Sequence, residues 1–184
     1  MKKEIENIKN KYYMIAKKIN APVESLHFYD IPKDLAYPHI EYENGEYAYV
    51  ITERGIEFER RITSDPDIIL FWLINSLTFE LASKYELNHR EESKDSRRLL
   101  FKHQLELLEK INPEWAKIEK EDQDKILKNY PYDDCLKLRN KLEKDLINQG
   151  LSNEEAWKKA CERYPEPEGM WGKEPPIEIR ERVE

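Results

Sequence analysis

Residues 38–63, PHIEYENGEYAYVITERGIEFERRIT, decide the fold of this 184-residue chain because they predict two successive β-hairpins. Asn44-Gly45 is the preferred dipeptide of a two-residue hairpin loop, since both residues tolerate positive φ angles. Arg54-Gly55 is the second expected loop, although Arg-Gly is a weaker turn dipeptide than Asn-Gly. The segment therefore predicts an antiparallel meander.

Counting outward from the two loops predicts the register of the strands. Because side chains alternate between the two faces of a strand, both hairpins place their apolar residues on the same face. We expect this inner face to be buried and the outer face to be solvated. The predicted inner face holds Ile40, Tyr42, Tyr47, Tyr49, Ile51, Phe58 and Ile62, and the predicted outer face holds Glu41, Thr52, Glu57, Glu59 and Arg61.

Arg60 is the exception, because the same register places it on the apolar face opposite Tyr49. An unpaired buried guanidinium costs several kcal/mol, so it needs a carboxylate or an aromatic ring beside it. We expect Arg60 to stack on Tyr49 or to pair with a carboxylate of the following helix. A structural role is favoured, and ligand binding is the alternative.

Helices are expected on both sides of the meander. Residues 3–19 have apolar side chains at spacings of three and four, which predicts an amphipathic helix; ESLHFYD then predicts a short strand and residues 31–38 a loop. Ser64 is the expected N-cap of a helix that runs to about Leu87 and is apolar almost all round, so the sheet and other helices should both cover it. Further helices are expected at 95–111 and 113–129, from an Asp133 cap to Gly150, and from Ser152 to before Pro165.

These elements predict the α+β class, with an N-terminal helix and a small antiparallel meander packed on a C-terminal bundle of about five helices. Residues 1–134 form the expected core, with the helix at 1–20, the meander at 25–63 and helices at 64–134. Residues 135–184 form the expected helical extension, ending in a segment rich in Pro and Gly around Trp171 that is docked by this tryptophan or mobile.

Composition and charge favour a folded, acidic protein. Hydrophobic residues make up 39% of the chain and aromatic residues 11%, which is unlike a disordered composition. The formal net charge of −7 disfavours nucleic acid binding and favours a basic protein partner.

Cys135 and Cys161 lack metal-ligand spacing, so reduced thiols in the cytoplasm are expected. Residues 1–19 lack the apolar run of a signal peptide, and the apolar residues 68–82 are too few for a bilayer, so no membrane segment is expected.

Motifs for catalysis are sparse. Glu86 and His89 have the Glu-x-x-His spacing of di-iron bundles, but such sites need a second copy, which this sequence lacks, so polar packing is favoured. His27, His39 and His103 occur without ligand spacing. No nucleophile elbow, phosphate loop or dinucleotide glycine pattern is present. We therefore expect no catalytic residue, no metal and no cofactor.

A dense polar cluster is expected at one corner between helices. The favoured interpretation is an ion-pair network that braces this corner. The alternative is an anion site for a nucleotide or phosphate, which would make the protein a small-ligand sensor or enzyme. The corner holds Glu86, His89, Arg90, Asp95, Arg97 and Arg98, and the same structural role is assigned to Glu53, Arg54, Arg60 and Arg61 of the meander.

A series of motifs in fixed order resembles the Imm63 family of immunity proteins from bacterial polymorphic toxin systems. The motifs are YAYVITERGIEFERRITSD, FW, LTFELASKYELNHR, DSRRLLFKHQLELLEKINPEWA and ILKNYPYDD, and they extend from Tyr47 to Asp134. The resemblance implies a small cytoplasmic protein that is made beside a toxin and protects the producing cell by binding the toxin domain. It implies no catalysis.

Acidic side chains supply the expected surface for a basic toxin, because a negative field accelerates association with a positive partner. The alternative for these residues is a solvated helix face, and a scaffold or regulator without a toxin partner is a further alternative for the protein. The sequence leaves the oligomeric state open. The candidate partner-binding residues are Glu119, Glu121, Asp122, Asp124, Asp133 and Asp134.

Overall fold

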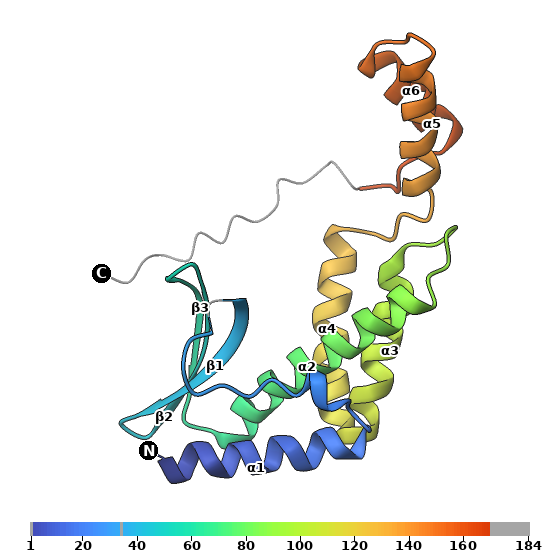
Figure 1. Cartoon of the computed structure of the whole chain (residues 1–184). Helices are drawn as coiled ribbons and strands as arrows, with labels where there is room; N and C mark the ends of the chain where they lie inside the picture. The colour runs from blue at the N-terminus through green and yellow to red at the C-terminus, as the bar shows by residue number, and fades with distance from the viewer. Residues whose placement is uncertain (1, 34, 170–184) are drawn as a thin grey trace.

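A computed structural model describes residues 2–33 and 35–169. In this part of the chain six α-helices accompany one three-stranded antiparallel sheet, which confirms the α+β class and the order of helix, meander and helices (Figure 1). The strands are β1 (Leu35–Glu43), β2 (Glu46–Glu53) and β3 (Ile56–Thr63), and a 3₁₀ turn, η1, covers Val23–Ser25. The helices are α1 (Lys2–Lys18), α2 (Pro66–Asn88), α3 (Ser96–Ile111), α4 (Pro113–Asn129), α5 (Leu136–Asn148) and α6 (Asn153–Arg163).

The connection between α1 and the sheet differs from the prediction. The segment ESLHFYD forms no strand; it contains part of η1 and one isolated bridge, in which the Ile40 amide donates to the Tyr29 carbonyl over 2.9 Å. Strand β1 begins inside the predicted loop at 31–38. Pro38 is compatible with a strand here because β1 lies at the edge of the sheet, where a missing N–H is tolerated.

The first hairpin has the predicted register. Asn44 and Gly45 adopt φ angles of 51° and 90°, as a two-residue loop of this kind requires. The confirmed pairs are Glu43 with Glu46, Tyr42 with Tyr47, Glu41 with Ala48 and Ile40 with Tyr49.

The second hairpin has the predicted loop but a different register beyond it. Thr52 pairs with Glu57, yet the next residue of β2, Ile51, pairs with Glu59, so Phe58 is the extra residue of a β-bulge. A shift of one residue moves every later side chain of β3 to the other face. The predicted faces of Arg60 and Arg61 are therefore wrong and exchanged.

The bulge also changes the exposure of β3. Phe58 and Ile62, predicted on the buried face, are 65% and 56% exposed. Arg61 instead lies opposite Tyr49, and Arg60 lies opposite Val50.

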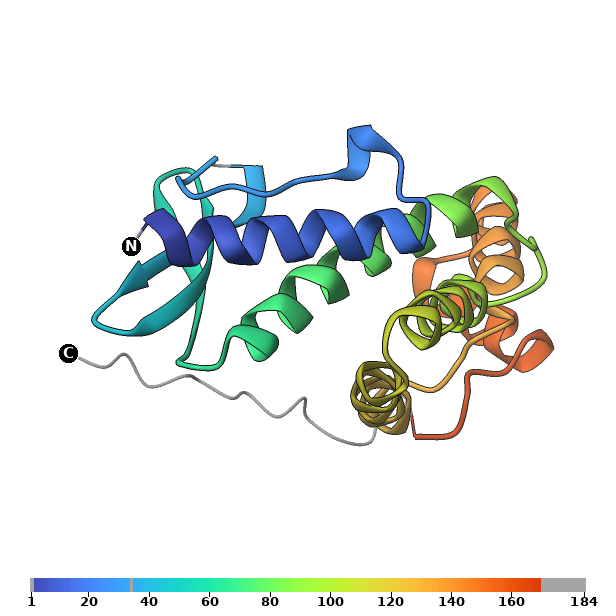
Figure 2. The same cartoon turned by 90° about the horizontal axis from the view of Figure 1, so that it is seen from below.

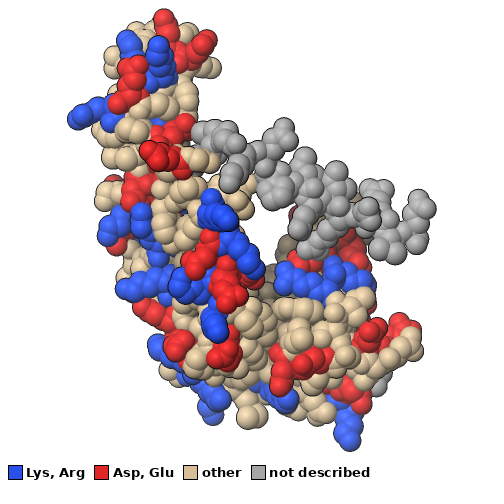
Figure 3. All heavy atoms as spheres, turned by 180° about the vertical axis from the view of Figure 1, so that it is seen from behind, with Lys and Arg blue, Asp and Glu red and all other residues tan. Residues whose placement is uncertain are grey.

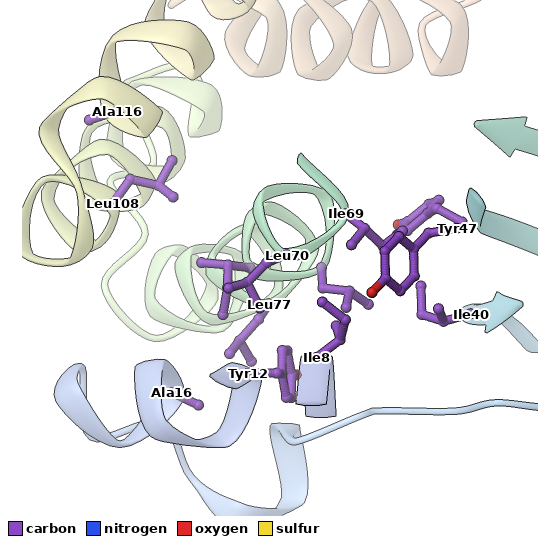
Figure 4. Packing of buried hydrophobic residues seen from close by; sticks show 13 residues of the cluster. Ile8, Tyr12, Ala16, Ile40, Tyr47, Ile69, Leu70, Leu77, Leu108 and Ala116 are labelled. Atoms are coloured by element: carbon purple, nitrogen blue, oxygen red, sulfur yellow. The ribbon is translucent and has the colours of Figure 1, made fainter. Parts of the chain in front are cut away.

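Helix α2 is the central element of the core. It runs beside α1 from the sheet toward α3 and α4, while α5 and α6 pack on each other at the far end (Figures 1 and 2). Ile8 and Tyr12 of α1 meet the buried side of α2 and the sheet (Figure 4). The other buried members of this cluster include Ile40, Tyr47, Tyr49, Ile69, Leu70, Leu73, Ile74, Leu77, Leu108 and Ala116.

A side chain caps the N-terminus of four helices. Asp65, and not the predicted Ser64, caps α2, because its carboxylate accepts the Asp67 amide over 2.8 Å. Asp95 caps α3, Asn112 caps α4, and Ser152 forms the predicted capping box with Glu155.

Asp133 is not the N-cap of α5, which begins at Leu136 after Cys135. Trp171 lies outside the described residues. Among the helices that are described, none combines the length and apolar character needed to cross a bilayer.

Candidate functional site

Helix α2 has one stripe that the rest of the fold does not cover. Ile68 and Phe79 are 42% and 48% exposed, and Trp72 between them is half-buried. Their spacing places the three side chains on one side of the helix. The prediction that sheet and helices together cover α2 is thus correct for its other sides and wrong for this stripe.

Trp72 and Phe79 of this stripe line a groove of about 700 Å³, which we call the α2 groove. Tyr49, Ile51 and Arg61 of the sheet line one side, and Gln104 of α3 and Glu119 of α4 line the other. From behind, the surface is hollowed between the sheet end and the helical end, and charges of both signs are interspersed over the visible face (Figure 3). The groove combines apolar and polar side chains from the sheet and from several helices.

Arg61 lies on the sheet side of the α2 groove and has the role expected of Arg60. Its guanidinium carbon lies 5.6 Å from the centre of the Tyr49 ring and 5.8 Å from that of Trp72, and it pairs with Glu59. The Tyr49 hydroxyl is 2.6 Å from Ser76 Oγ, and burial raises the pKa of Tyr49. These contacts hold the arginine against the aromatic wall.

Arg60 lies on the other face of the sheet, in a surface ion-pair cluster. Its Nε and Nη2 donate to both Glu57 oxygens over 3.0 and 2.8 Å, and Nη1 donates to Glu41 over 2.7 Å. The hydrogen bond from Arg60 lowers the pKa of Glu41. The predicted carboxylate pairing is present, but it comes from the sheet and not from a helix.

A chain of amide side chains holds Glu119 at the groove. Asn75 Nδ2 donates to Glu119 Oε2 over 2.8 Å, and Gln123 Nε2 lies 3.2 Å from Glu119 Oε1. Gln104 Nε2 donates to Asn75 Oδ1 over 2.9 Å, and Gln104 Oε1 accepts from Gln123 Nε2 over 3.0 Å. The four side chains form a closed ring that joins α2, α3 and α4. Burial raises the pKa of Glu119, since only neutral amides bind its carboxylate.

The polar corner contains the predicted ion pairs. Arg90 donates to both oxygens of the buried Glu86 carboxylate over 2.7 and 2.6 Å, and this lowers the pKa of Glu86. His89 stacks on Tyr85 with ring centres 4.1 Å apart. Glu86 and His89 therefore have separate partners, and no group of metal-ligating side chains occurs among the described residues.

Asp95 joins the corner to the segment that precedes α5. Arg97 donates to Asp95 and, over 2.8 Å, to the Tyr130 carbonyl. Asp95 Oδ2 accepts the Asp133 amide, and Asp134 Oδ1 accepts the Asp95 amide, each over 2.9 Å. These bonds clamp the loop before α3 onto residues 130–134.

Arg98 completes the corner. It donates to both Asp134 oxygens over 2.8 and 3.0 Å and lies 4.2 Å from the centre of the Tyr132 ring. With Arg90, Arg97 and Arg98 each bound to a carboxylate of the chain, the corner offers no free guanidinium to a phosphate. The nucleotide or phosphate alternative has no supporting observation.

Asp133 and Arg139 form a buried ion pair at the start of α5, with side chains 2% and 0% exposed. Arg139 also lies 5.6 Å from the centre of the Trp157 ring and 3.4 Å from the Tyr164 carbonyl. The pair thus joins α5 to α6. Sequence reasoning missed Arg139, because nothing in the local pattern around it distinguishes it from a surface arginine.

The other candidate acidic residues lie on the surface of α4. Asp122 and Asp124 are exposed and pair with Lys125 and Lys120, each over 2.7 Å. Glu121 is exposed on the same helix. Of the predicted partner-binding set, the structure places Asp133 in the interior and Asp134 in the corner, so accessible carboxylates remain on α4. Their role in partner binding stays a prediction.

Glu53 and Arg54 lie at the second hairpin loop, away from the polar corner. Arg54 is exposed, Glu53 is half-buried, and neither forms an ion pair within the described part of the chain. Their assignment to a polar network stays a prediction. Sequence reasoning also did not single out Asn75, Gln104 and Gln123, although their isolated polarity between apolar residues was an available signal.

The fold and the groove define the class: a small α+β protein with an open groove along its central helix. Residues 43–125 match the family model Imm63, described as Immunity protein 63, so this segment is similar to the Imm63 family. The match confirms the resemblance that the sequence motifs indicated, although ILKNYPYDD at 126–134 lies outside the matched residues. No curated protein and no solved structure matched the chain.

Proposed function

We propose that this chain is a non-catalytic immunity protein, which binds a cognate toxin domain in the cytoplasm of the producing bacterium and blocks its action. The observation that carries the proposal is the Imm63 match over residues 43–125. The same residues include β2, β3, α2 and α3, and thus most of the lining of the α2 groove. The matched segment therefore supplies a surface on which a partner could be held.

Neutralisation by binding needs shape and charge, and no reacting group. A toxin domain is inactivated when its active site is covered or its substrate path is blocked. The net charge of −7 supports a basic toxin partner, because opposite net charges accelerate encounter. Nucleic acid and membrane partners and a bound cofactor are not part of the proposal.

The test is co-expression with the toxin domain encoded beside this gene. Growth should be lost when the toxin domain is produced alone and restored when this chain is produced with it. The purified proteins should then form a complex in size-exclusion chromatography. Growth that stays arrested, with this chain folded and present at the level of the toxin, would contradict the proposal.

A further inference from the structure

The charges of the α2 groove do not balance. Its cationic side chains already have carboxylate partners: Arg61 pairs with Glu59, and Lys84 pairs with Glu80 over 2.7 Å. Glu119 lines the same groove and forms no ion pair with any described residue. Among the described residues, the unpaired charges of the groove, on Glu119 and on the exposed Glu24, are therefore negative.

Glu119 retains unused hydrogen-bonding capacity. An ionised carboxylate has about four acceptor positions, and each Glu119 oxygen accepts a single amide N–H, from Asn75 or from Gln123. The closed ring of hydrogen bonds with Asn75, Gln104 and Gln123, which we call the amide ring, fixes the position of the carboxylate without neutralising it. Burial raises its pKa, so the ionised form would be stabilised by a cation that enters the groove.

The floor beside Glu119 is suited to the stem of a long side chain. Phe79 lies one helical turn from Asn75, the residue that holds Glu119, and is 48% exposed. Trp72 lies on the same side of α2, and Ser76 between these aromatics and Ser83 one turn beyond Phe79 are small. Aliphatic stems of Lys and Arg pack on such surfaces, and aromatic faces attract their cationic heads.

We propose that the α2 groove receives an arginine or lysine side chain of the toxin domain, which pairs with Glu119 and packs its stem on Phe79 and Trp72. This inference rests on the proposed function and identifies the surface and the chemistry of the contact. A desolvated charge pair of this kind acts mainly on the dissociation rate, whereas charges at the rim act on the association rate.

The first test compares Glu119→Gln with Asp124→Asn, two equal charge changes on α4. Dissociation of the purified complex with the toxin domain is followed by surface plasmon resonance. Glu119→Gln should raise the dissociation rate constant about tenfold or more, because the toxin cation loses its partner. Asp124→Asn should leave that rate constant within about twofold, since Asp124 is exposed and pairs with Lys120.

A second pair of variants covers the case in which Glu119→Gln disturbs the amide ring. Phe79→Lys would place a resident cation in the groove at a half-exposed position, and Met14→Lys makes the same charge change on α1, where Met14 is 67% exposed. Phe79→Lys should weaken toxin binding about tenfold or more, because it competes for Glu119. Met14→Lys should not.

The outcomes separate this inference from the proposed function. If toxin binding and growth rescue persist while Glu119→Gln and Phe79→Lys leave the dissociation rate constant unchanged, the groove is not the contact and this inference is wrong. If the unmodified chain neither binds nor rescues, the proposed function fails, and this inference fails with it. The pairing would be established by a toxin variant in which one basic residue is neutralised. This variant should bind more weakly, and Glu119→Gln should then cause no further loss of affinity.

Discussion

At the scale of single residues, the two hairpin loops differ in how well their first residue suits a positive φ angle. Arg54 has a φ angle of 52°, a region in which a side chain with Cβ is strained and asparagine is tolerated. We predict that Arg54→Asn stabilises the protein by up to about 1 kcal/mol. The midpoint of thermal unfolding should rise by about 2–4 °C. Since Asn44 already occupies the equivalent position of the first loop, Asn44→Arg is the matched control and should lower the midpoint.

The titration of Glu119 makes a second prediction at this scale. Its folded-state pKa is raised by burial above the ordinary value of 4.5, so its contribution to stability is fully present below that value. The contribution is lost as the pH rises through the raised pKa. Glutamine does not titrate, so the free energy of unfolding of Glu119→Gln relative to the unmodified protein should increase as the pH rises from about 4 to about 7. Urea unfolding across this range measures the difference, and a constant difference would contradict a buried, ionising Glu119.

At the scale of elements, the bulge in β3 determines which arginine enters the groove. Phe58 has no partner in β2, so its deletion should leave a regular ladder with Arg61 still opposite Tyr49. Deletion of Arg60 should instead turn Arg61 to the outer face. We expect the Phe58 deletion to lose at most about 2 kcal/mol of stability and to keep its near-ultraviolet circular dichroism. We expect the Arg60 deletion to lose more stability than this and to lose its near-ultraviolet circular dichroism as well. Equal damage from the two deletions would disprove this register.

The buried pair between Asp133 and Arg139 governs the junction of α5 with the rest of the chain. Arg139→Met should destabilise the protein by about 3–5 kcal/mol, because it leaves Asp133 buried without a cation. Arg98→Met breaks the more exposed pair with Asp134 and should cost about 1 kcal/mol or less. Chemical denaturation gives both values. Similar losses for the two variants would show that burial does not distinguish the pairs.

The elements that sequence reasoning predicted well are those whose signals are local. Asn44-Gly45 set the first register, and Asn112-Pro113 marked the boundary of α3 and α4 through backbone preferences of adjacent residues. The bulge at Phe58 was missed because the turn sequence is compatible with strands with or without an extra residue. The contacts of β3 with Tyr49 and Trp72, which decide between the two registers, are not visible in the sequence.

The candidate site was predictable only in part, for the same reason. The ion pairs of the polar corner join residues near one another in sequence or at helix ends, and the pattern indicated them. Glu119 was identified as acidic and available, but its place beside Asn75 and Gln104 depends on how three helices pack. Likewise, the inward position of Asp133 follows from Arg139, which lies on a helix beyond the recognised motifs.

At the scale of the whole molecule, net charge should affect how fast the toxin is found. Asp122 and Asp124 are exposed on α4, so the double variant Asp122→Asn, Asp124→Asn should slow association about two- to tenfold at low salt and weaken its salt dependence. The dissociation rate constant should change little. Stopped-flow association at two salt concentrations measures this, with Glu106→Gln and Glu109→Gln on α3 as a control for the same loss of charge. If both double variants slow association equally, steering comes from net charge and not from α4.

The central claim is that this chain protects a cell by holding a toxin domain, and growth rescue tests it most directly. Cells that produce the toxin domain encoded beside this gene should grow when they also produce the unmodified chain. They should grow poorly when they produce Phe79→Lys, provided that both chains are folded and equally abundant. Arrested growth with the unmodified chain would contradict the account, and full rescue by both would retain the immunity function but remove the α2 groove from it.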